Sequence, residues 1–426
     1  MKAYLPHVKR GLAMIGGNLA NFALTLGRNK LLAIFFGPAG IGWIALVNNL
    51  IETAAVVGGM GVCDAYNREL PRKRPDFTQS EIVSSGIGLF ALTLLIALPV
   101  STAFFLFTVD SEASIVAGAI AFALAAALAS AWRALSGIYL GLGLSRRMFK
   151  AVVAGGTANL ALAAILLFAG VRDLMAYVLM TPALLAIAGT WGVWPQLQDL
   201  VDWPAVKAMP ARKPILTIAL PIVAGLLLEP ATILLLRSET ASRFGQEGVG
   251  LVQPGMLFVI LAASLANAFL GMTLARWDQS EEPAFSRRFM ALIVAAIVLP
   301  TCGIAVVFLL QPLWPYLVEL FFTSAFVAGA ATVPWFVSGE LLRMGGIMLN
   351  HTLLSRKLGY ATLLPRLACL TTVVVAIHLG MIDSILAVGQ AYAAAYAAYL
   401  ALSIVLWLLA QVHFRRTGKR QLAANS

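Results

Sequence analysis

Long apolar runs alternate with short polar segments along the whole chain. Most runs approach or exceed the roughly 20 residues that an α-helix needs to cross the hydrocarbon core of a bilayer. Prolines, glycines and charge clusters separate the runs, and the pattern predicts one membrane-spanning helix in each. The twelve expected helices cover about residues 11–36, 41–63, 82–107, 115–143, 151–169, 174–194, 215–237, 249–275, 289–310, 327–350, 365–381 and 385–411.

Composition agrees with this pattern. Of the 426 residues, 60% are hydrophobic and only 12% are charged, which is typical of a polytopic, all-α integral membrane protein. Cys63, Cys302 and Cys369 lie in or at the ends of apolar runs, so we interpret them as small core residues. The sequence thus predicts neither a metal site nor a cofactor. The opening MKAYLPHVKRG carries three cations before a long apolar run, which predicts an uncleaved signal anchor.

Lysines and arginines collect in alternate connections between the expected helices. Such cations concentrate on the cytoplasmic side of a membrane protein. The N-terminal tail, the C-terminal tail and every second loop hold most of the 30 cations, so both termini are expected in the cytoplasm. The net charge of +11 therefore reflects topology, and we expect no nucleic-acid partner.

Two short patterns recur about half a chain apart. Leu144-Ser145-Arg146-Arg147 returns 210 residues later as Leu354-Ser355-Arg356-Lys357, and Gly40-Ile41-Gly42 returns 208 residues later as Gly248-Val249-Gly250. Together they indicate an internal duplication. The expected domains are an N-terminal six-helix bundle at 1–200, a cytoplasmic linker at 201–214, a C-terminal six-helix bundle at 215–411 and a basic cytoplasmic tail at 412–426.

Six helices per half give both halves the same orientation in the membrane. Their pseudo-twofold axis then runs along the membrane normal, and parallel repeats of this kind form a substrate site at their interface. The predicted architecture is two related six-helix bundles around a central cavity.

Several charges lie inside expected spans, where each costs roughly 3 kcal/mol unless it meets water or a partner. The arginines among them occur in pairs: Arg28 and Arg237 are 209 residues apart, and Arg133 and Arg343 are 210 apart. We therefore expect four arginines to face one cavity, two from each half. The cations are Arg28, Lys30, Arg133, Arg237 and Arg343, and the acids are Glu52, Glu229 and Glu340.

The first expected helix carries a polar stripe. Asn18, Asn21, Thr25 and Arg28 are spaced three, four and three residues apart, which places them on one helical face. Lys30 is about 200° around the helix from Arg28, so the two cannot share that face. Snorkelling to the outer headgroups is the alternative for Arg28 and Arg237, and a helix contact is the alternative for Lys30.

The acids leave two interpretations open. Glu52, with Asn48 one turn earlier, is either a proton carrier or the partner of a buried arginine. Glu340 lies three residues before Arg343, so it either couples an ion or neutralises that arginine. We therefore name Glu52 and Glu340 as candidates for ion coupling.

Tyr392, Tyr396 and Tyr399 form a stripe on the last expected helix. Tyrosine rings stack on sugars, but in membrane helices they also pack against neighbouring helices. Both roles are open for Tyr392.

Cations outnumber acids within the expected spans. Guanidinium groups bind phosphate oxygens through paired hydrogen bonds, so this surplus favours an anionic substrate. A cavity for organic cations should instead be rich in acids. The candidate substrate-binding residues are Arg28, Lys30, Arg133, Arg237, Arg343, Asn18, Asn21, Asn48 and Tyr392.

Three stretches resemble Wzx-type lipid-linked oligosaccharide flippases, in particular those of the enterobacterial common antigen. They are KLLAIFFGPAGIG at 30–42, GELLRMGG at 339–346 and QAYAAAY at 390–396, and EPATILLLR at 229–237 followed by Gly248-Val249-Gly250 also fits the family in spacing. The resemblance implies a fold of the multidrug/oligosaccharidyl-lipid/polysaccharide (MOP) superfamily, with two six-helix bundles in a V around a cationic cavity.

The implied activity is to move undecaprenyl-diphosphate-linked oligosaccharide from the cytoplasmic to the periplasmic leaflet of the bacterial inner membrane. Such translocation serves the biosynthesis of O-antigen or similar surface polysaccharides. The resemblance also implies coupling to a proton or sodium gradient, and a polysaccharide polymerase or chain-length complex is a candidate partner.

The resemblance extends to single residues. Lys30 matches a family lysine, Arg237 a family arginine, and Glu340 with Arg343 an acid and base pair of the Asp and Lys type. Asn48 stands where the compared relative has a cation, and Val252 where it has tryptophan, so the implied glycan differs.

Two other functions compete with a flippase. A drug or metabolite antiporter of the MATE type would share the superfamily fold. A membrane glycosyltransferase, polymerase or ligase would need a sizeable extramembrane region or an acidic metal-binding motif, whereas this chain has no long loop, no Asp-x-Asp and four histidines. We therefore expect a transporter and not an enzyme.

Overall fold

The computed structural model describes residues 5–59, 61–71, 76–108, 115–277, 287–355 and 359–424. All regular elements in these ranges are helical. In chain order they are α1 (Leu5–Gly59), α2 (Val62–Glu69), α3 (Gln79–Thr108), α4 (Ile115–Gly141), α5 (Ser145–Phe168), α6 (Leu174–Leu200), α7 (Trp203–Ala208), α8 (Arg212–Trp277), α9 (Arg287–Leu309), η1 (Gln311–Leu313), α10 (Trp314–Phe321), η2 (Ser324–Thr332), α11 (Val333–Ser355), η3 (Gly359–Thr362), α12 (Leu363–His378) and α13 (Ile385–Ala424).

Ten helices among the described residues are long and apolar enough to span a membrane. Two of them, α1 and α8, each contain two expected helices joined at a glycine. The twelve expected segments are therefore all present, and the chain is a multi-pass, all-α membrane protein. The short helices α2, α7 and α10 were not expected, because segments of six to eight residues are too short for a clear periodic signal.

The two joining glycines adopt the same unusual backbone conformation. Gly37 has φ 63° and ψ −168°, and Gly245 has φ 68° and ψ −176°. This region is essentially restricted to glycine, because a Cβ would collide with the backbone. The same turn thus occurs twice, 208 residues apart, directly before the two glycine patterns that indicated a duplication.

A second pair of turns repeats in the same way. Gly170 (φ 79°) follows α5 and Gly380 (φ 68°) follows α12. Their amides donate to the carbonyl oxygens of Leu167 and Ile377, at 3.1 and 3.0 Å, and so end both helices with equivalent left-handed caps. The structure therefore repeats its local geometry as well as its sequence.

The described residues form two compact units, and each is treated separately. One unit contains residues 20–234, and the other contains residues 1–19 with 235–426. These bounds differ from the expected six-helix halves, because the first turns of α8 pack inside the first unit. Ala211 and Ile215 join Tyr66, Val83 and Tyr139 in its hydrophobic core. The division at 201–214 thus stays a prediction about the sequence repeat.

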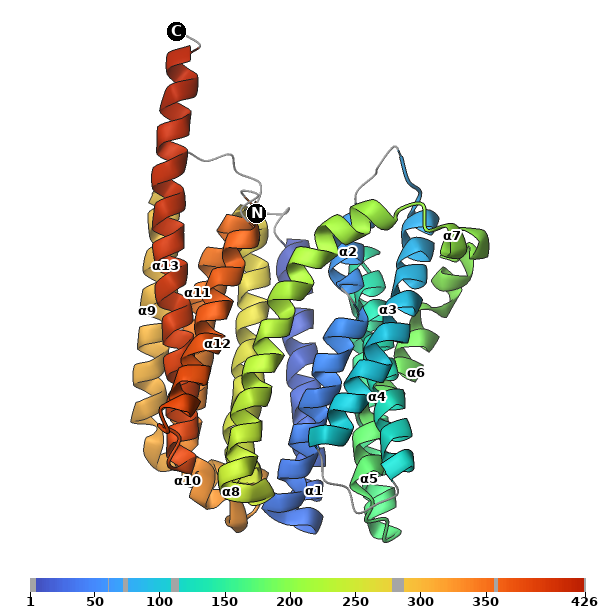
Figure 1. Cartoon of the computed structure of the whole chain (residues 1–426), viewed down its shortest axis with the longest axis vertical. Coiled ribbons are helices and arrows are strands. Elements are labelled where there is room, and N and C mark those ends of the chain that lie inside the picture. The colour runs from blue at the N-terminus through green and yellow to red at the C-terminus, as the bar shows by residue number, and fades with distance from the viewer. Residues whose placement is uncertain are drawn as a thin grey trace. The chain divides into compact units, whose positions relative to one another are not determined.

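In the second unit, α11 packs against α9 and α13, and α12 packs against α13 (Figure 1). Leu349 and Trp407 are among the residues that form its core. Beside that core, Asn350 Nδ2 donates to Tyr399 Oη at 2.8 Å and so ties α11 to α13. This packing positions the charged residues of α11.

Candidate functional site

In the unit of residues 20–234, Arg133 of α4 meets Glu52 of α1. Arg133 Nη2 lies 2.5 Å from Glu52 Oε2. The side chains are 37% and 57% exposed, although both residues lie within candidate membrane spans. Glu52 was expected to be either a proton carrier or the partner of a buried arginine, and the structure shows it paired with an arginine. Arg133 is not buried, so the guanidinium and the carboxylate are both accessible at a depth in the membrane where contact with lipid would be unfavourable.

In the second unit, Glu340 and Arg343 form an ion pair within α11. Arg343 Nε and Nη2 donate to the two carboxylate oxygens of Glu340, at 2.7 and 2.6 Å. Glu340 is 1% exposed and Arg343 is 14% exposed. The intrahelical pair that the three-residue spacing predicted is therefore confirmed, and it is held in a buried, bidentate geometry.

The two repeated arginines obtain their acids differently. The residue 210 positions before Glu340 is Ser130, whose hydroxyl donates to the Ala126 carbonyl oxygen at 2.7 Å. Arg133 therefore has no acid in the position equivalent to Glu340 and pairs with another helix instead. The charge pairing is maintained in both units by different residues.

Arg28 is buried between helices of its own unit. It is 7% exposed, and its Nη2 donates to the Tyr177 carbonyl oxygen of α6 at 3.3 Å. Thr25 donates to the Asn21 carbonyl oxygen at 2.9 Å, and the Asn21 side chain lies against Gly156 of α5. From Asn21 onward the expected polar stripe thus lies against α5 and α6. The side chain of Asn18 lies outside the described residues.

Arg237 is buried to the same degree in the second unit. It is 8% exposed, and its Nη2 donates to Gln253 Oε1 at 3.0 Å, across the Gly245 turn of α8. The snorkelling interpretation is therefore wrong for both Arg28 and Arg237, since a snorkelling guanidinium would be exposed. Gln253 was missed by sequence reasoning, although a polar residue inside the apolar run 249–275 was a usable signal.

The remaining candidates occupy less polar surroundings. Lys30 and Asn48 are half-buried in α1. Tyr392 is buried between Phe336 and Tyr396, with ring centroids 4.9 and 4.8 Å away, and it lies close enough to Arg237 to interact electrostatically. The packing interpretation thus describes Tyr392 in this structure. Its role toward sugars stays a prediction, as does the meeting of four arginines in one cavity.

No group of three or more His, Cys, Asp or Glu residues suitable for a metal ion occurs within the described ranges. Cys63, Cys302 and Cys369 are free thiols, of which Cys369 is buried and Cys302 is exposed.

Comparisons with known proteins identify the fold. No family model and no curated protein matches the sequence. Among solved structures, an inward-facing multidrug resistance transporter of the MATE family in the MOP superfamily is similar over 96% of this chain and 99% of its own, with 17% identity and a TM-score of 0.65. An outward-facing one is similar over 97% and 96%, with 16% identity and a TM-score of 0.64.

A third structure is a MOP superfamily transporter from Pyrococcus furiosus. It covers 96% of this chain and 95% of its own at 16% identity, with a TM-score of 0.64, and its description reports a binding pocket of reverse polarity that suggests a different function. Likeness at this level of identity defines the fold and leaves the substrate open. The chain therefore has the fold shared by MATE transporters of the MOP superfamily.

Proposed function

We propose that this protein is a transporter that works by alternating access. The fold supports this, because similar solved structures include both an inward-facing and an outward-facing conformation. The glycine turns at Gly37 and Gly245 provide equivalent breaks in α1 and α8, each between two membrane-spanning segments.

The proposed substrate is undecaprenyl-diphosphate-linked oligosaccharide, moved to the periplasmic leaflet for the biosynthesis of an O-antigen-like or enterobacterial common antigen-like polysaccharide. The observation that carries this proposal is the exposed guanidinium of Arg133 inside a membrane span, together with its repeat at Arg343. Arginine binds diphosphate oxygens through paired hydrogen bonds. Lys30 would add a third cation, and the lipid tail would stay in the bilayer.

Glu52 and Glu340 are the proposed coupling residues for a proton or sodium ion. Each is held by an arginine, so arrival of an anionic diphosphate would compete for that arginine and release the carboxylate. The same proposal places both termini in the cytoplasm and the chain in the bacterial inner membrane, where a polysaccharide polymerase or chain-length complex is a candidate partner.

A drug or metabolite antiporter of the MATE type is the second candidate. The observation that favours it is the carboxylate of Glu52, which is 57% exposed within a candidate span and could attract an organic cation. The Pyrococcus furiosus structure, described as having reversed pocket polarity, illustrates that pocket charge varies on this fold.

A transport assay separates the two. The purified full chain would be reconstituted into vesicles that contain a radiolabelled undecaprenyl-diphosphate oligosaccharide, and arrival in the opposite leaflet would be measured with an impermeant sugar-cleaving enzyme. Parallel vesicles would hold an organic cation dye under a proton or sodium gradient. We expect glycolipid movement without dye efflux.

Arg133→Gln should reduce glycolipid movement at least about tenfold, a loss of roughly 1.4 kcal/mol of substrate interaction. Arg68→Gln is the matched control, since Arg68 is exposed on α2 outside the candidate spans. Dye efflux without glycolipid movement would support the antiporter, and unchanged movement by the Arg133 variant would overturn the role given to this arginine.

A further inference from the structure

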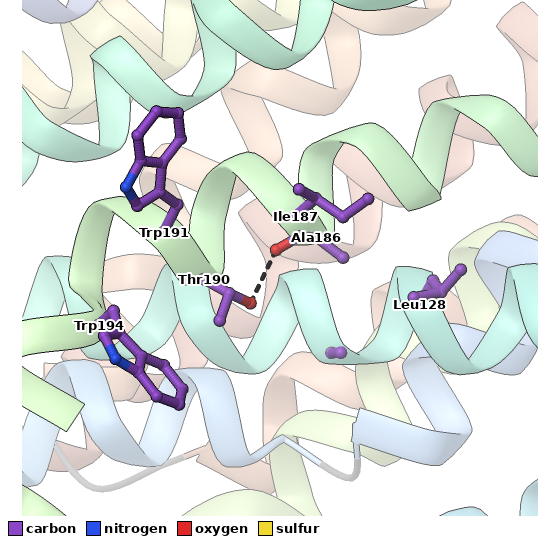
Figure 2. Close-up of a pocket in the computed structure, with 7 residues that line it drawn as sticks. Leu128, Ala186, Ile187, Thr190, Trp191 and Trp194 are labelled. Carbon is purple, nitrogen blue, oxygen red and sulfur yellow. Dashed lines mark hydrogen bonds between the residues drawn. The ribbon is translucent and has the colours of Figure 1, made fainter. Parts of the chain in front are cut away.

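A groove of about 480 Å³ lies between α4 and α6, entirely within the unit of residues 20–234 (Figure 2). Figure 2 shows the indole rings of Trp191 and Trp194 projecting from α6 beside it. The groove is lined by Leu128, Ala131, Ala186, Ile187, Thr190, Trp191 and Trp194. None of these residues belongs to the candidate transport site.

The groove offers hydrocarbon contacts and almost no polar ones. Its single hydroxyl, on Thr190, already donates to the Ala186 carbonyl oxygen at 2.8 Å. Trp191 is 83% exposed, and Trp194 and Ile187 are more than half exposed. Apart from the indole N–H groups of Trp191 and Trp194, the lining side chains are apolar or already hydrogen-bonded, so such a surface inside a membrane span accepts an apolar chain.

The groove has a defined depth in the membrane. Ala186 lies roughly 21 Å, and Trp194 roughly 9 Å, from the end of α6 at Leu200, at 1.5 Å per residue. The groove therefore runs from the middle of the span toward one membrane surface. Trp194 lies at the depth where tryptophan rings are enriched in membrane proteins.

Cations gather at the same end. Arg146, Arg147 and Lys150, here termed the basic cluster, are exposed at the start of α5, directly after α4 ends. Arg147 interacts electrostatically with Tyr139. The Tyr139 hydroxyl in turn donates to the Gly189 carbonyl oxygen at 2.6 Å, one residue before Thr190. This connection places Arg147 near the turn of α6 that lines the groove.

We propose that the groove binds one acyl chain of an anionic phospholipid whose phosphate contacts the basic cluster. The occupant follows from charge complementarity: the three exposed cations of the basic cluster stand at the surface end of an apolar groove, against the two exposed carboxylates of Asp199 on the last turn of α6 and Asp202 just after it. Each cation near the surface strengthens the binding of an anionic headgroup by about fivefold. This lipid site is separate from the proposed transport of a glycolipid and does not depend on it.

Tryptophan quenching by brominated lipid tests the site. The full chain would be placed in phosphatidylcholine vesicles that contain either phosphatidylglycerol brominated on its acyl chains or brominated phosphatidylcholine at the same mole fraction. We expect stronger quenching by the brominated phosphatidylglycerol. This excess quenching by brominated phosphatidylglycerol over brominated phosphatidylcholine should disappear in the double variant Trp191→Phe with Trp194→Phe. It should persist in Trp203→Phe, since Trp203 is exposed on α7 outside the groove.

Two further variants probe the chain and the headgroup separately. Ala131→Phe narrows the groove while keeping both tryptophans, and it should abolish the excess quenching. Replacing Arg146, Arg147 and Lys150 by Gln should lower the preference for phosphatidylglycerol by about fivefold for each cation that contacts the phosphate. Gel filtration of each variant confirms that it is folded.

The outcomes are distinct. Equal quenching by the two brominated lipids would mean that ordinary bilayer lipid covers this face, and the proposal would be wrong. A preference for phosphatidylglycerol that survives in the groove variants would place the anionic lipid elsewhere and would also overturn it.

Discussion

Arg133 and Glu52 form an ion pair across 81 residues of sequence, with Nη2 and Oε2 2.5 Å apart. Both side chains are more than a third exposed while lying in membrane-spanning helices. An exposed pair stabilises a fold by at most about 1 kcal/mol. Its position in the spans is therefore better explained by function than by stability.

Charge exchange at this pair should distinguish substrate binding from pairing. We expect Glu52→Gln and Arg133→Gln to reduce glycolipid transport at least about tenfold with little change in melting temperature, because the pair contributes little stability. The exchanged double variant, Glu52→Arg with Arg133→Glu, should stay inactive, since the arginine no longer stands where the diphosphate binds. Transport restored by the exchange would show that pairing alone matters.

Breaking the Glu340 and Arg343 pair should affect stability instead. Arg343→Gln leaves the carboxylate of Glu340, which is 1% exposed, without its bidentate partner, and such a loss typically costs about 3–5 kcal/mol. The double variant Glu340→Gln with Arg343→Gln should recover much of that loss. Thermal unfolding in detergent measures the stability of the single and the double variant. Equal melting temperatures for these two variants would contradict the prediction.

The repeated glycine turns should tolerate no side chain. Gly37→Ala and Gly245→Ala should each destabilise the protein by about 1–3 kcal/mol, because their φ and ψ values are accessible to glycine almost alone. Gly59→Ala is the matched control, since a Cβ added there would meet no neighbouring side chain or helix within 4 Å and its φ is not positive. Unfolding temperatures that fall equally in all three variants would show that backbone conformation is not the cause.

Arg28 and Lys30 should differ in function. Arg28 is buried against α6, so Arg28→Met should keep the fold and most transport, as apolar replacements of buried charges often do. Lys30 is half-buried and should be the more sensitive position, with Lys30→Met lowering transport at least about threefold. Initial transport rates at equal protein density give the comparison. A larger loss in the Arg28 variant would reverse the assignment.

Topology can be measured with single cysteines. Ser145→Cys at the start of α5, and Val171→Cys between α5 and α6, would be introduced after the three native cysteines are replaced by alanine. If the basic loops are cytoplasmic, an impermeant thiol reagent added to cells should label position 171 and leave position 145 unlabelled. The opposite pattern would reverse the orientation.

Local features of this protein were predictable from sequence. The twelve helical segments follow from the length of each apolar run, which the bilayer thickness sets. The pairing of Glu340 with Arg343 follows from their three-residue spacing on one helix. The repeated glycines were also visible, although their shared backbone conformation was not.

Contacts between distant segments needed the tertiary structure. Periodicity placed Asn21, Thr25 and Arg28 on one face, but packing decided that this face meets α5 and α6. Likewise, only the structure shows that Ala211 and Ile215, at the start of α8, pack in the core of the unit of residues 20–234.

The sequence by itself thus determined where this chain crosses the membrane, because the bilayer sets the length of each apolar run. It also showed that the arginines within the spans and the glycine patterns occur twice, because the repeated residues can be compared directly. Which carboxylate holds Arg133, and which face of α1 is covered, were decided by tertiary structure alone. Those contacts join residues that are 81 and 149 positions apart, and no local preference specifies them.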